Sequence, residues 1–222
     1  MQKGHTTETD HYRFLAGKHW LTDPIQGLFM SRPRKALIGQ IKALNPQRVL
    51  DVCCGSGDIA RHFTRAGIET TGVDSSDSML QRAREKRRIN HIHKLDVTQM
   101  DFHKEFDVAY VSLAIHEMSA DTREQVWKKM LQAVRDGGTI IVLDFSVAKK
   151  KRFWSRFWSG FTELDEKSFL KTNPPHYYNY KEFMSNGGVY DWLLQCAGKI
   201  DKAETFFADT LAVLSIHVSG TE

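Results

Sequence analysis

The chain has 222 residues, of which 41% are hydrophobic and 26% are charged. This length accommodates one large domain, and the composition is that of a globular protein and excludes intrinsic disorder. Lysine and arginine exceed the acidic residues by 31 − 27 = 4, so the net charge alone does not force a role in binding nucleic acid or membranes.

The cysteines and the apolar runs bear on the cellular compartment. Two of the three cysteines, Cys53 and Cys54, are adjacent, which argues against a disulfide framework and for a reducing compartment. The longest apolar runs, such as 140–143, are far shorter than the roughly 20 residues of a membrane helix. The first residues lack the apolar segment of a signal peptide. We therefore expect a cytoplasmic protein.

Between about Arg48 and Ser146 short β-branched runs alternate with helical patterns, which is typical of a parallel sheet built from βα units. The expected strands are 48–53, 69–74, 92–97, 106–113 and 139–145, and the expected helices are 58–65, 78–88 and 121–134. Asp121 and Glu124 have the spacing of a capping box, and Gly137-Gly138 is expected to end the third helix.

The composition changes after Phe145. Residues 147–180 are rich in Lys, Phe, Trp and Tyr, and Pro174-Pro175 is expected to form a turn. A helical pattern over 180–197 is followed by two strands, 202–207 and 211–218. Because a connection this short cannot make a parallel crossover, these strands pair as an antiparallel hairpin. The sequence therefore predicts an α/β fold with seven strands, of which five are parallel.

The strongest functional signal is a strand that runs into a glycine-rich turn at 49–60. Gly55 and Gly57 let the backbone pass close to a bound cofactor, and the amides that follow favour an anionic group. Asp74 ends the next strand, where a carboxylate can accept both hydroxyls of a ribose. Asp96 ends the third strand, where it can accept an adenine amino group. The carboxyl ends of adjacent strands are where open α/β sheets bind ligands.

A nicotinamide dehydrogenase is the first alternative, because Gly55, Gly57 and Ala60 fit the dinucleotide fingerprint when it is read loosely. Asp51 argues against it, since dinucleotide-binding folds usually have an apolar residue at that point of the strand. The expected C-terminal hairpin argues against it too.

The motif DxxCGxG at 51–57, followed by Asp74 and Asp96, resembles the motif series of class I S-adenosylmethionine-dependent methyltransferases. The resemblance covers residues 45–146 well and the hairpin loosely, and it implies a Rossmann-like seven-stranded fold. Residues 21–24 and 183–194 are faintly similar to quinone-type C-methyltransferases.

The resemblance implies S-adenosylmethionine as cofactor and S-adenosylhomocysteine as product. The implied cofactor-binding residues are Asp51, Cys54, Gly55, Gly57, Asp74, Ser75, Asp96, Val97, Ser112 and Leu113. Among these, Asp51 and the two glycines would surround the methionine end, Asp74 would hold the ribose, and Asp96 with Val97 the adenine. Ser112 and Leu113 would lie beside the transferable methyl group, and Cys54 would pack under the loop.

We expect a single methyltransferase domain over 1–222, with N-terminal lid helices at 1–44, the cofactor-binding core at 45–146, an aromatic lid at 147–180 and a helix with the hairpin at 181–222. The expected substrate-lid residues are Tyr12, Trp20, His116, Trp154, Trp158 and Tyr177. The aromatic stripe at 153–161 follows a basic run, a pattern typical of a packed helix face and also of a helix that rests on an anionic membrane. Lid packing is favoured, and weak membrane contact through 149–161 stays open.

His116 follows the fourth strand and is the candidate general base or orienting donor, unless it only caps the loop or packs beneath the lid. No metal site is expected, because histidine, cysteine and carboxylate residues show no metal-ligand spacing. The basic run at 82–88 is typical of a solvated helix face, although nucleic-acid contact stays open.

The expected function is transfer of a methyl group from S-adenosylmethionine to a small, apolar or aromatic molecule. Two alternatives remain, a nucleic-acid methyltransferase and a non-catalytic S-adenosylmethionine-binding module. The sequence identifies neither the acceptor, the atom methylated nor the oligomeric state.

Overall fold

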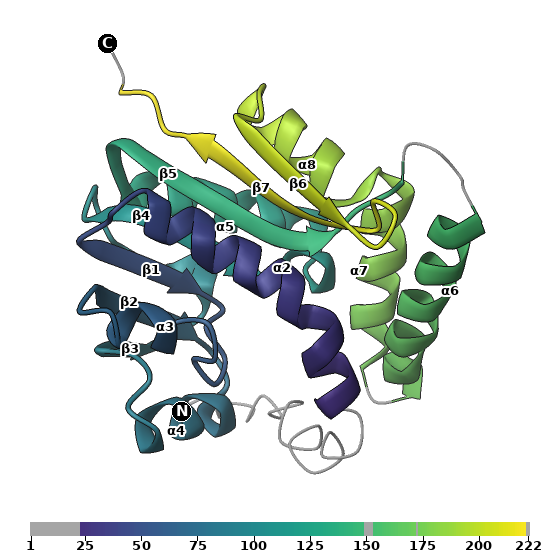
Figure 1. Cartoon of the computed structure of the whole chain (residues 1–222), viewed down its shortest axis with the longest axis horizontal. Coiled ribbons are helices and arrows are strands. Elements are labelled where there is room, and N and C mark those ends of the chain that lie inside the picture. Colours follow the sequence, from purple (N-terminus) through teal and green to yellow (C-terminus); the bar gives the residue numbers. More distant parts are fainter. Residues whose placement is uncertain (1–22, 149–152, 172, 221–222) are drawn as a thin grey trace, which may run out of the picture.

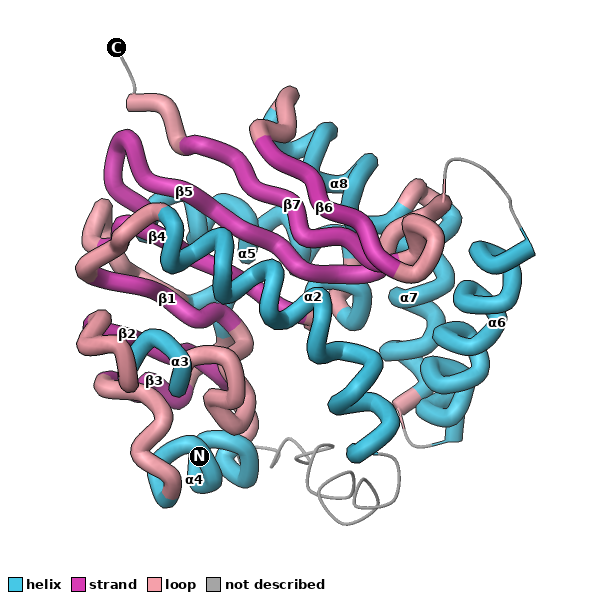
Figure 2. Tube along the Cα trace, viewed as in Figure 1, coloured by secondary structure: helices cyan, strands magenta, loops and turns pink. Residues whose placement is uncertain are grey.

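A computed structural model describes residues 23–148, 153–171 and 173–220. Figures 1 and 2 show one sheet with helices on both of its faces. The predicted lid residues Tyr12 and Trp20, and the basic run at 149–152, lie outside the described residues.

The sheet has seven strands in the order β3-β2-β1-β4-β5-β7-β6. Their bounds are β1 Arg48–Val52, β2 Glu69–Asp74, β3 His91–Lys94, β4 Phe106–Ser112, β5 Val134–Phe145, β6 Lys202–Phe206 and β7 Leu211–His217. The first five strands pair in parallel, and β7 runs antiparallel between β5 and β6. The predicted Rossmann-like fold is therefore confirmed. β2 and β3 lie on one side of β1, whereas β4 and β5 lie on the other side. This change in strand order between β1 and β4 leaves a crevice at the carboxyl ends of these two strands.

The helices surround this sheet. Their bounds are α2 Asp23–Ala43, α3 Arg61–Thr64, α4 Asp77–Glu85, α5 Ala120–Ala133, α6 Phe153–Lys167, α7 Pro174–Ser185 and α8 Gly188–Ala197, with short 3-10 turns η1 Val97–Gln99, η2 Ile115–Glu117 and η3 Ser168–Lys171. α2 and α3 lie over one face, α5 and α8 over the other, and α6 and α7 stand beside the carboxyl ends of the strands (Figure 1). Among the described helices, none has the length and apolarity that crossing a membrane requires.

Successive side chains of the strands point to opposite faces of the sheet and pack into two hydrophobic cores. On β4, Ala109 and Val111 join the core under α5 and α8, while Val108 and Tyr110 join the core under α2 and α3. All four are buried, as expected for a parallel strand covered on both faces. This double burial holds the carboxyl ends of the central strands in fixed positions.

The third predicted helix differs from the structure at both ends. Ser119, not the capping-box pair, caps α5, because its hydroxyl accepts a hydrogen bond from the Thr122 amide at 3.3 Å. The helix ends at Ala133 and β5 begins at Val134, so the prediction that Gly137-Gly138 ends the helix is wrong. Val134 is buried and pairs with Phe106 of β4, which draws the chain into the sheet before the glycines.

The predicted helix over 180–197 is two helices, α7 and α8, and the expected turn at Pro174-Pro175 is the start of α7. Proline suits the first turn of a helix, where its missing amide has no partner to lose. The break between the helices falls at Gly187 and Gly188, whose φ angles are +93° and +66°. A Cβ atom on Gly188 would lie 2.8 Å from the carbonyl oxygen of Phe145, so this close approach of α8 to β5 requires glycine.

Candidate functional site

A cavity of about 580 Å³ opens at the carboxyl ends of the central strands. Nine of the ten predicted cofactor-binding residues line it, namely Asp51, Cys54, Gly55, Asp74, Ser75, Asp96, Val97, Ser112 and Leu113. The volume lies within the range of small-molecule sites. The structure thus brings together residues that lie more than sixty positions apart in the sequence.

Gly57 is the tenth residue, and it does not line the cavity. Its φ is +72°, and a Cβ atom there would lie 3.0 Å from the side chains of Arg88 and Ile89. A Cβ atom on Gly55 would meet only Met79 Cε at 3.8 Å. Gly57 therefore serves packing of the loop, whereas Gly55 leaves room at the cavity.

Two other residues of the cavity wall have left-handed backbone without being glycine. Cys53 follows β1 with φ +58°, and Leu113 follows β4 with φ +55°. Such residues cost of order 1–3 kcal/mol each and cluster at binding and catalytic sites. Because they lie where the two central strands end, the strain coincides with the crevice that the strand order creates.

Asp51 is buried at the end of β1, and its Oδ2 accepts a hydrogen bond from the hydroxyl of Tyr110 at 2.5 Å. Burial raises the pKa of Asp51 to about 8, with the charge of Asp74 acting in the same direction and the Tyr110 hydrogen bond against it. This carboxyl group is therefore mostly protonated at neutral pH when the cavity is free. A cation placed beside it would favour the ionised form.

Asp74 joins the end of β2 to the glycine loop. Its Oδ2 accepts a hydrogen bond from the Gly55 amide at 2.8 Å, and its Oδ1 accepts one from the Ser76 amide at 2.9 Å. The Ser75 backbone donates to this carboxylate as well, and a carboxylate with about four acceptor sites keeps capacity for a ligand. Burial raises the pKa of Asp74 above its ordinary value, against the hydrogen bonds.

Asp96 lies in the turn after β3, at the exposed rim of the cavity. Its Oδ1 accepts hydrogen bonds from the amide and the hydroxyl of Thr98, both at 2.8 Å, and so caps η1. This fixes the position of the carboxylate beside Val97.

The cavity also contains residues that sequence reasoning did not select. Arg34 of α2 contributes a cation, and Ala114, Glu117 and Met118 extend the wall beyond β4. No motif marks Arg34, which lies seventeen positions before Asp51 in an ordinary helical pattern. The segment after β4 could have been selected from its position alone.

His116 is buried and is not among the residues that line the cavity. Its Nδ1 lies 2.6 Å from Oδ1 of Asp144, whose Oδ2 accepts hydrogen bonds from the amides of Ile115 and His116. Burial lowers the pKa of His116, but the Asp144 carboxylate outweighs it, and the result is a pKa of about 9. The predicted base thus stands behind the cavity wall, in contact with a buried carboxylate at the end of β5.

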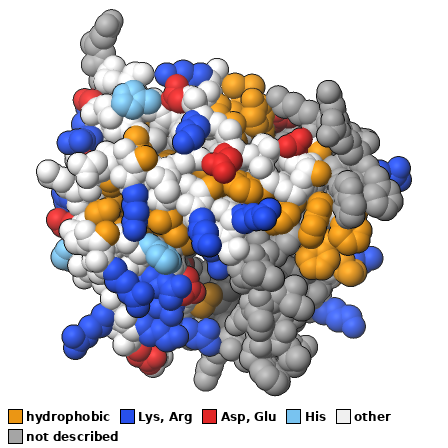
Figure 3. Space-filling view, viewed as in Figure 1, with side chains coloured by type: hydrophobic (Ala, Val, Ile, Leu, Met, Phe, Trp, Pro, Cys, Tyr) orange, Lys and Arg blue, Asp and Glu red, His pale blue; other side chains and the backbone are white. Residues whose placement is uncertain are grey.

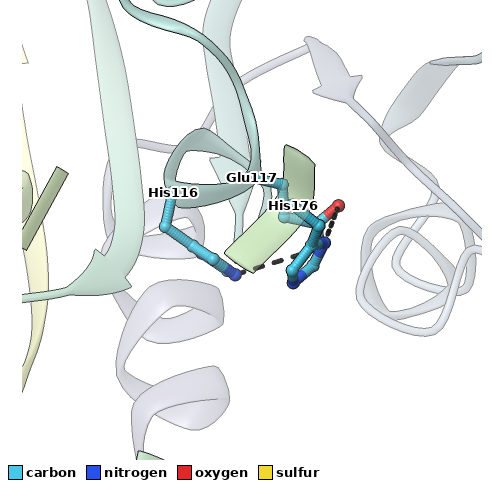
Figure 4. Close-up of side chains that lie close together, drawn as sticks. All are labelled: His116, Glu117 and His176. Carbon is cyan, nitrogen blue, oxygen red and sulfur yellow. Dashed lines mark ion pairs between the residues drawn. The ribbon is translucent and has the colours of Figure 1, made fainter. Parts of the chain in front are cut away.

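A second histidine, His176 of α7, faces the same loop (Figure 4). Its Nε2 lies 2.6 Å from Oε2 of Glu166, and its Nδ1 lies 3.5 Å from Oε2 of Glu117. Burial lowers the pKa of His176, yet the two glutamates raise it to about 10. One ligand-type atom from each of His116, Glu117 and His176 lies within 4.8 Å of the others. Local spacing, on which the sequence analysis relied, could not show this cluster.

The predicted aromatic lid is described only in part. Trp158 packs on Phe207 in the turn between β6 and β7, with ring centroids 5.0 Å apart, and the Tyr177 hydroxyl donates to Glu163 at 3.3 Å. Neither lines the cavity. Trp154 belongs to α6, but its side chain is outside the described residues. Phe157 is 52% exposed, and membrane contact through this segment stays a prediction.

The residues of the basic run at 82–88 have two different roles. The Arg88 guanidinium donates to the Ser56 carbonyl at 3.0 Å and to Asp58 at 2.6 Å, and so supports the glycine loop. Arg82, Arg84, Lys86 and Arg87 are exposed, and Figure 3 shows cationic side chains gathered over this part of the surface. Most of the run is thus a solvated face, as predicted for such patterns.

A methyltransferase-domain family model matches residues 49–138. Demethylmenaquinone methyltransferase of Thermotoga maritima is 29% identical over 65% of this chain and 64% of its own length. Malonyl-[acyl-carrier protein] O-methyltransferase of Salmonella typhimurium is 33% identical over 41% of this chain and 36% of its own length. The PH0226 protein of Pyrococcus horikoshii shares the fold, with a TM-score of 0.63 at 16% identity over 96% of this chain and 98% of that one.

The chain thus matches less than two thirds of the length of these two curated relatives. The matched region holds the glycine loop, Asp74 and Asp96, and the seven-stranded order agrees with the fold that these motifs imply. Residues 49–138 thus match a methyltransferase domain, and the motifs and fold of the chain are similar to those of class I S-adenosylmethionine-dependent methyltransferases.

Proposed function

We propose that this protein transfers a methyl group from S-adenosylmethionine to a small, apolar or aromatic acceptor. The observation that carries the proposal is one cavity lined by the glycine loop and by carboxylates from three adjacent strands. The demethylmenaquinone methyltransferase relative supports an apolar acceptor, because its name assigns it a quinone-type substrate.

The charges around the cavity fit the cofactor. Asp51 would ionise beside the cationic methionine end, and Asp74, held by two backbone amides, would accept the ribose hydroxyls. Asp96, at the rim, would take the adenine amino group. Arg34 would pair with the cofactor's carboxylate, since it brings a guanidinium into a cavity otherwise rich in acids.

The acceptor would lie at the end of β4. Leu113, Ala114 and Met118 form an apolar wall there, and Glu117 is the adjacent acid. Apolar walls with few polar groups are typical of small-molecule sites. A phosphate-rich acceptor would meet carboxylates instead of cations at this end.

When bound, S-adenosylmethionine supplies a methyl group on a sulfonium and leaves as the neutral thioether S-adenosylhomocysteine. The acceptor atom would supply the electron pair of the new bond to the methyl carbon. The chain's contribution is alignment and the exclusion of water, for which the fixed ends of β1 and β4 are suited. An acceptor that loses a proton would have Glu117 as the nearest carboxylate of the wall.

The proposal is tested by calorimetry and by transfer of a labelled methyl group. S-adenosylmethionine and S-adenosylhomocysteine should bind, and NADH should not. Acceptor candidates are a short-chain demethylmenaquinol, simple phenols, malonyl-loaded carrier protein, RNA and DNA. Label in the phenol or quinol supports the proposal.

Two other results would overturn it. Label found only in RNA or DNA would make the protein a nucleic-acid methyltransferase. Cofactor binding with no transfer to any acceptor would make it a binding module.

A further inference from the structure

The loop after β4 and the start of α7 bring two histidines to one place. His116 and Glu117 belong to η2, and His176 lies in the first turn of α7. Figure 4 shows the three side chains pointing toward one another. His116 and His176 are 3% and 6% exposed, with ring centroids 5.9 Å apart.

Each imidazole is oriented through one nitrogen by a buried carboxylate. Asp144 holds Nδ1 of His116 at 2.6 Å, and Glu166 holds Nε2 of His176 at 2.6 Å. Asp144 is itself fixed by backbone amides, including that of Phe145 at 2.7 Å. Metal-binding histidines are typically held in this way, because a carboxylate fixes the ring and leaves the other nitrogen to the ion.

The second nitrogens of both rings face carboxylates of the cluster. Nε2 of His116 lies 3.9 Å from Oε1 of Glu117 and 3.6 Å from Oε1 of Glu166, and Nδ1 of His176 lies 3.5 Å from Oε2 of Glu117. Two ligand atoms about 2.1 Å from a tetrahedral ion lie about 3.4 Å apart. The observed separations therefore approach those of ligands around one ion. If the distances between the three ligand atoms shortened by less than about 1.5 Å, all three could bind the same ion.

We propose that His116, Glu117 and His176 bind a divalent transition-metal ion, with Asp144 and Glu166 orienting the two histidines. Two imidazoles and one carboxylate suit Zn²⁺ or Fe²⁺, whereas Mg²⁺ and Ca²⁺ take oxygen ligands. Metal-bound imidazoles are neutral, so in the metal-bound form a dication would offset most of the negative charge of the three carboxylates Glu117, Asp144 and Glu166.

The position of Glu117 determines which side of the proposed metal site faces the cavity. Glu117 lines the cavity, whereas His116 lies behind it. Coordination positions not filled by the protein would open on the Glu117 side, where a water or an oxygen-containing ligand could bind. The metal-binding proposal itself stands whichever acceptor the enzyme uses.

A ladder of buried ion pairs without a metal is the competing interpretation. It would hold α7 on the η2 loop through the same residues, so geometry alone does not separate it from a metal site. Metal analysis of the 222-residue chain separates the two interpretations.

The test measures metal content and thermal stability. The protein is produced with added zinc or, anaerobically, iron, and also stripped with a chelator and titrated with Zn²⁺, Co²⁺ and Mg²⁺. We expect about one Zn²⁺ or Fe²⁺ per chain, a Tm that rises with Zn²⁺ but not with Mg²⁺, and a visible Co²⁺ spectrum.

Variants identify the ligands. His176→Gln and Glu117→Gln should weaken Zn²⁺ binding at least tenfold, and Asp144→Asn by roughly 10–100-fold as an orienting residue. His103→Gln is the control, because this histidine is exposed and its neighbours are Asp101 and Gln132, not residues of the cluster. Glu117 is partly exposed, so its variant keeps the test decisive if a histidine variant fails to fold.

The proposal fails if the protein holds no stoichiometric metal and Zn²⁺ and Co²⁺ change neither Tm nor spectrum. It fails equally if both ligand variants bind Zn²⁺ as tightly as the parent. A Glu117→Gln variant with a changed Tm that no metal affects would identify the ion-pair ladder instead.

Discussion

Binding of S-adenosylmethionine should release a proton from Asp51. Burial raises the pKa of this group to about 8, so most of the free protein carries the proton at pH 7. A cofactor ammonium about 4 Å away contributes roughly 4 kcal/mol at an effective dielectric constant of about 20, which lowers the pKa by about 3 units. Most of one proton per site should then leave on binding at pH 7.

The sign of the pH dependence follows directly. Because the complex holds fewer protons than the free protein, affinity should rise with pH, roughly tenfold from pH 6 to pH 7. The α-amino group of the cofactor, with an ordinary pKa of about 8, stays mostly charged in this window.

The assay is calorimetry at pH 7 in two buffers with different ionisation enthalpies, since the difference in observed heat counts the protons. Asp51→Asn should abolish the release and flatten the pH profile. Tyr110→Phe removes the hydrogen bond that lowers the pKa of Asp51, so release should persist to higher pH. Buffer-independent heats for the parent protein, or equal release from Asp51→Asn, would refute the reasoning.

Three further outcomes are expected. Asp74→Ala should weaken S-adenosylmethionine binding at least tenfold by calorimetry, because hydrogen bonds to a charged group contribute roughly 1.5–3 kcal/mol; unchanged affinity would contradict the ribose assignment. Gly72→Ala should lower Tm by roughly 2–10 °C, because its Cβ would lie 2.8 Å from Sγ of Cys54 and 2.7 Å from Ile89 Cδ1; an unchanged melting curve would show that the neighbours yield freely. Trp158→Ala should lower Tm through its lost packing on Phe207 while leaving cofactor affinity within about twofold; a large loss of affinity would show that the lid reaches the cofactor.

The cavity lining at the ends of β1, β2 and β4 could be predicted because its residues follow the ends of successive strands. The periodicity of β1, β2 and β4 fixes where each strand ends, and βα topology puts those ends at one edge. Asp51, Asp74 and Ser112 therefore reach one cavity. The short connection at 208–210 likewise predicted the antiparallel pairing of β6 with β7.

The remaining features depend on tertiary contacts that no local pattern encodes. His116 and His176 are sixty positions apart, and they meet only because α7 packs against η2. Arg34 reaches the cavity through the placement of α2, which amphipathic spacing does not specify. The end of α5 was misplaced because Val134 pairs with β4 before the glycines are reached, a case of sheet formation overriding a local stop signal.

The position of β7 has a consequence for how the molecule is made. This strand, Leu211–His217, inserts between β5 and β6 and pairs with β5 over seven residues. During synthesis, the edge of β5 that pairs with β7 therefore stays unpaired while some sixty-five further residues are synthesised. Unpaired strand edges promote association between chains. Chains ending before Leu211 should accumulate as aggregates, and ribosome-bound intermediates should recruit chaperones until the last strand has docked.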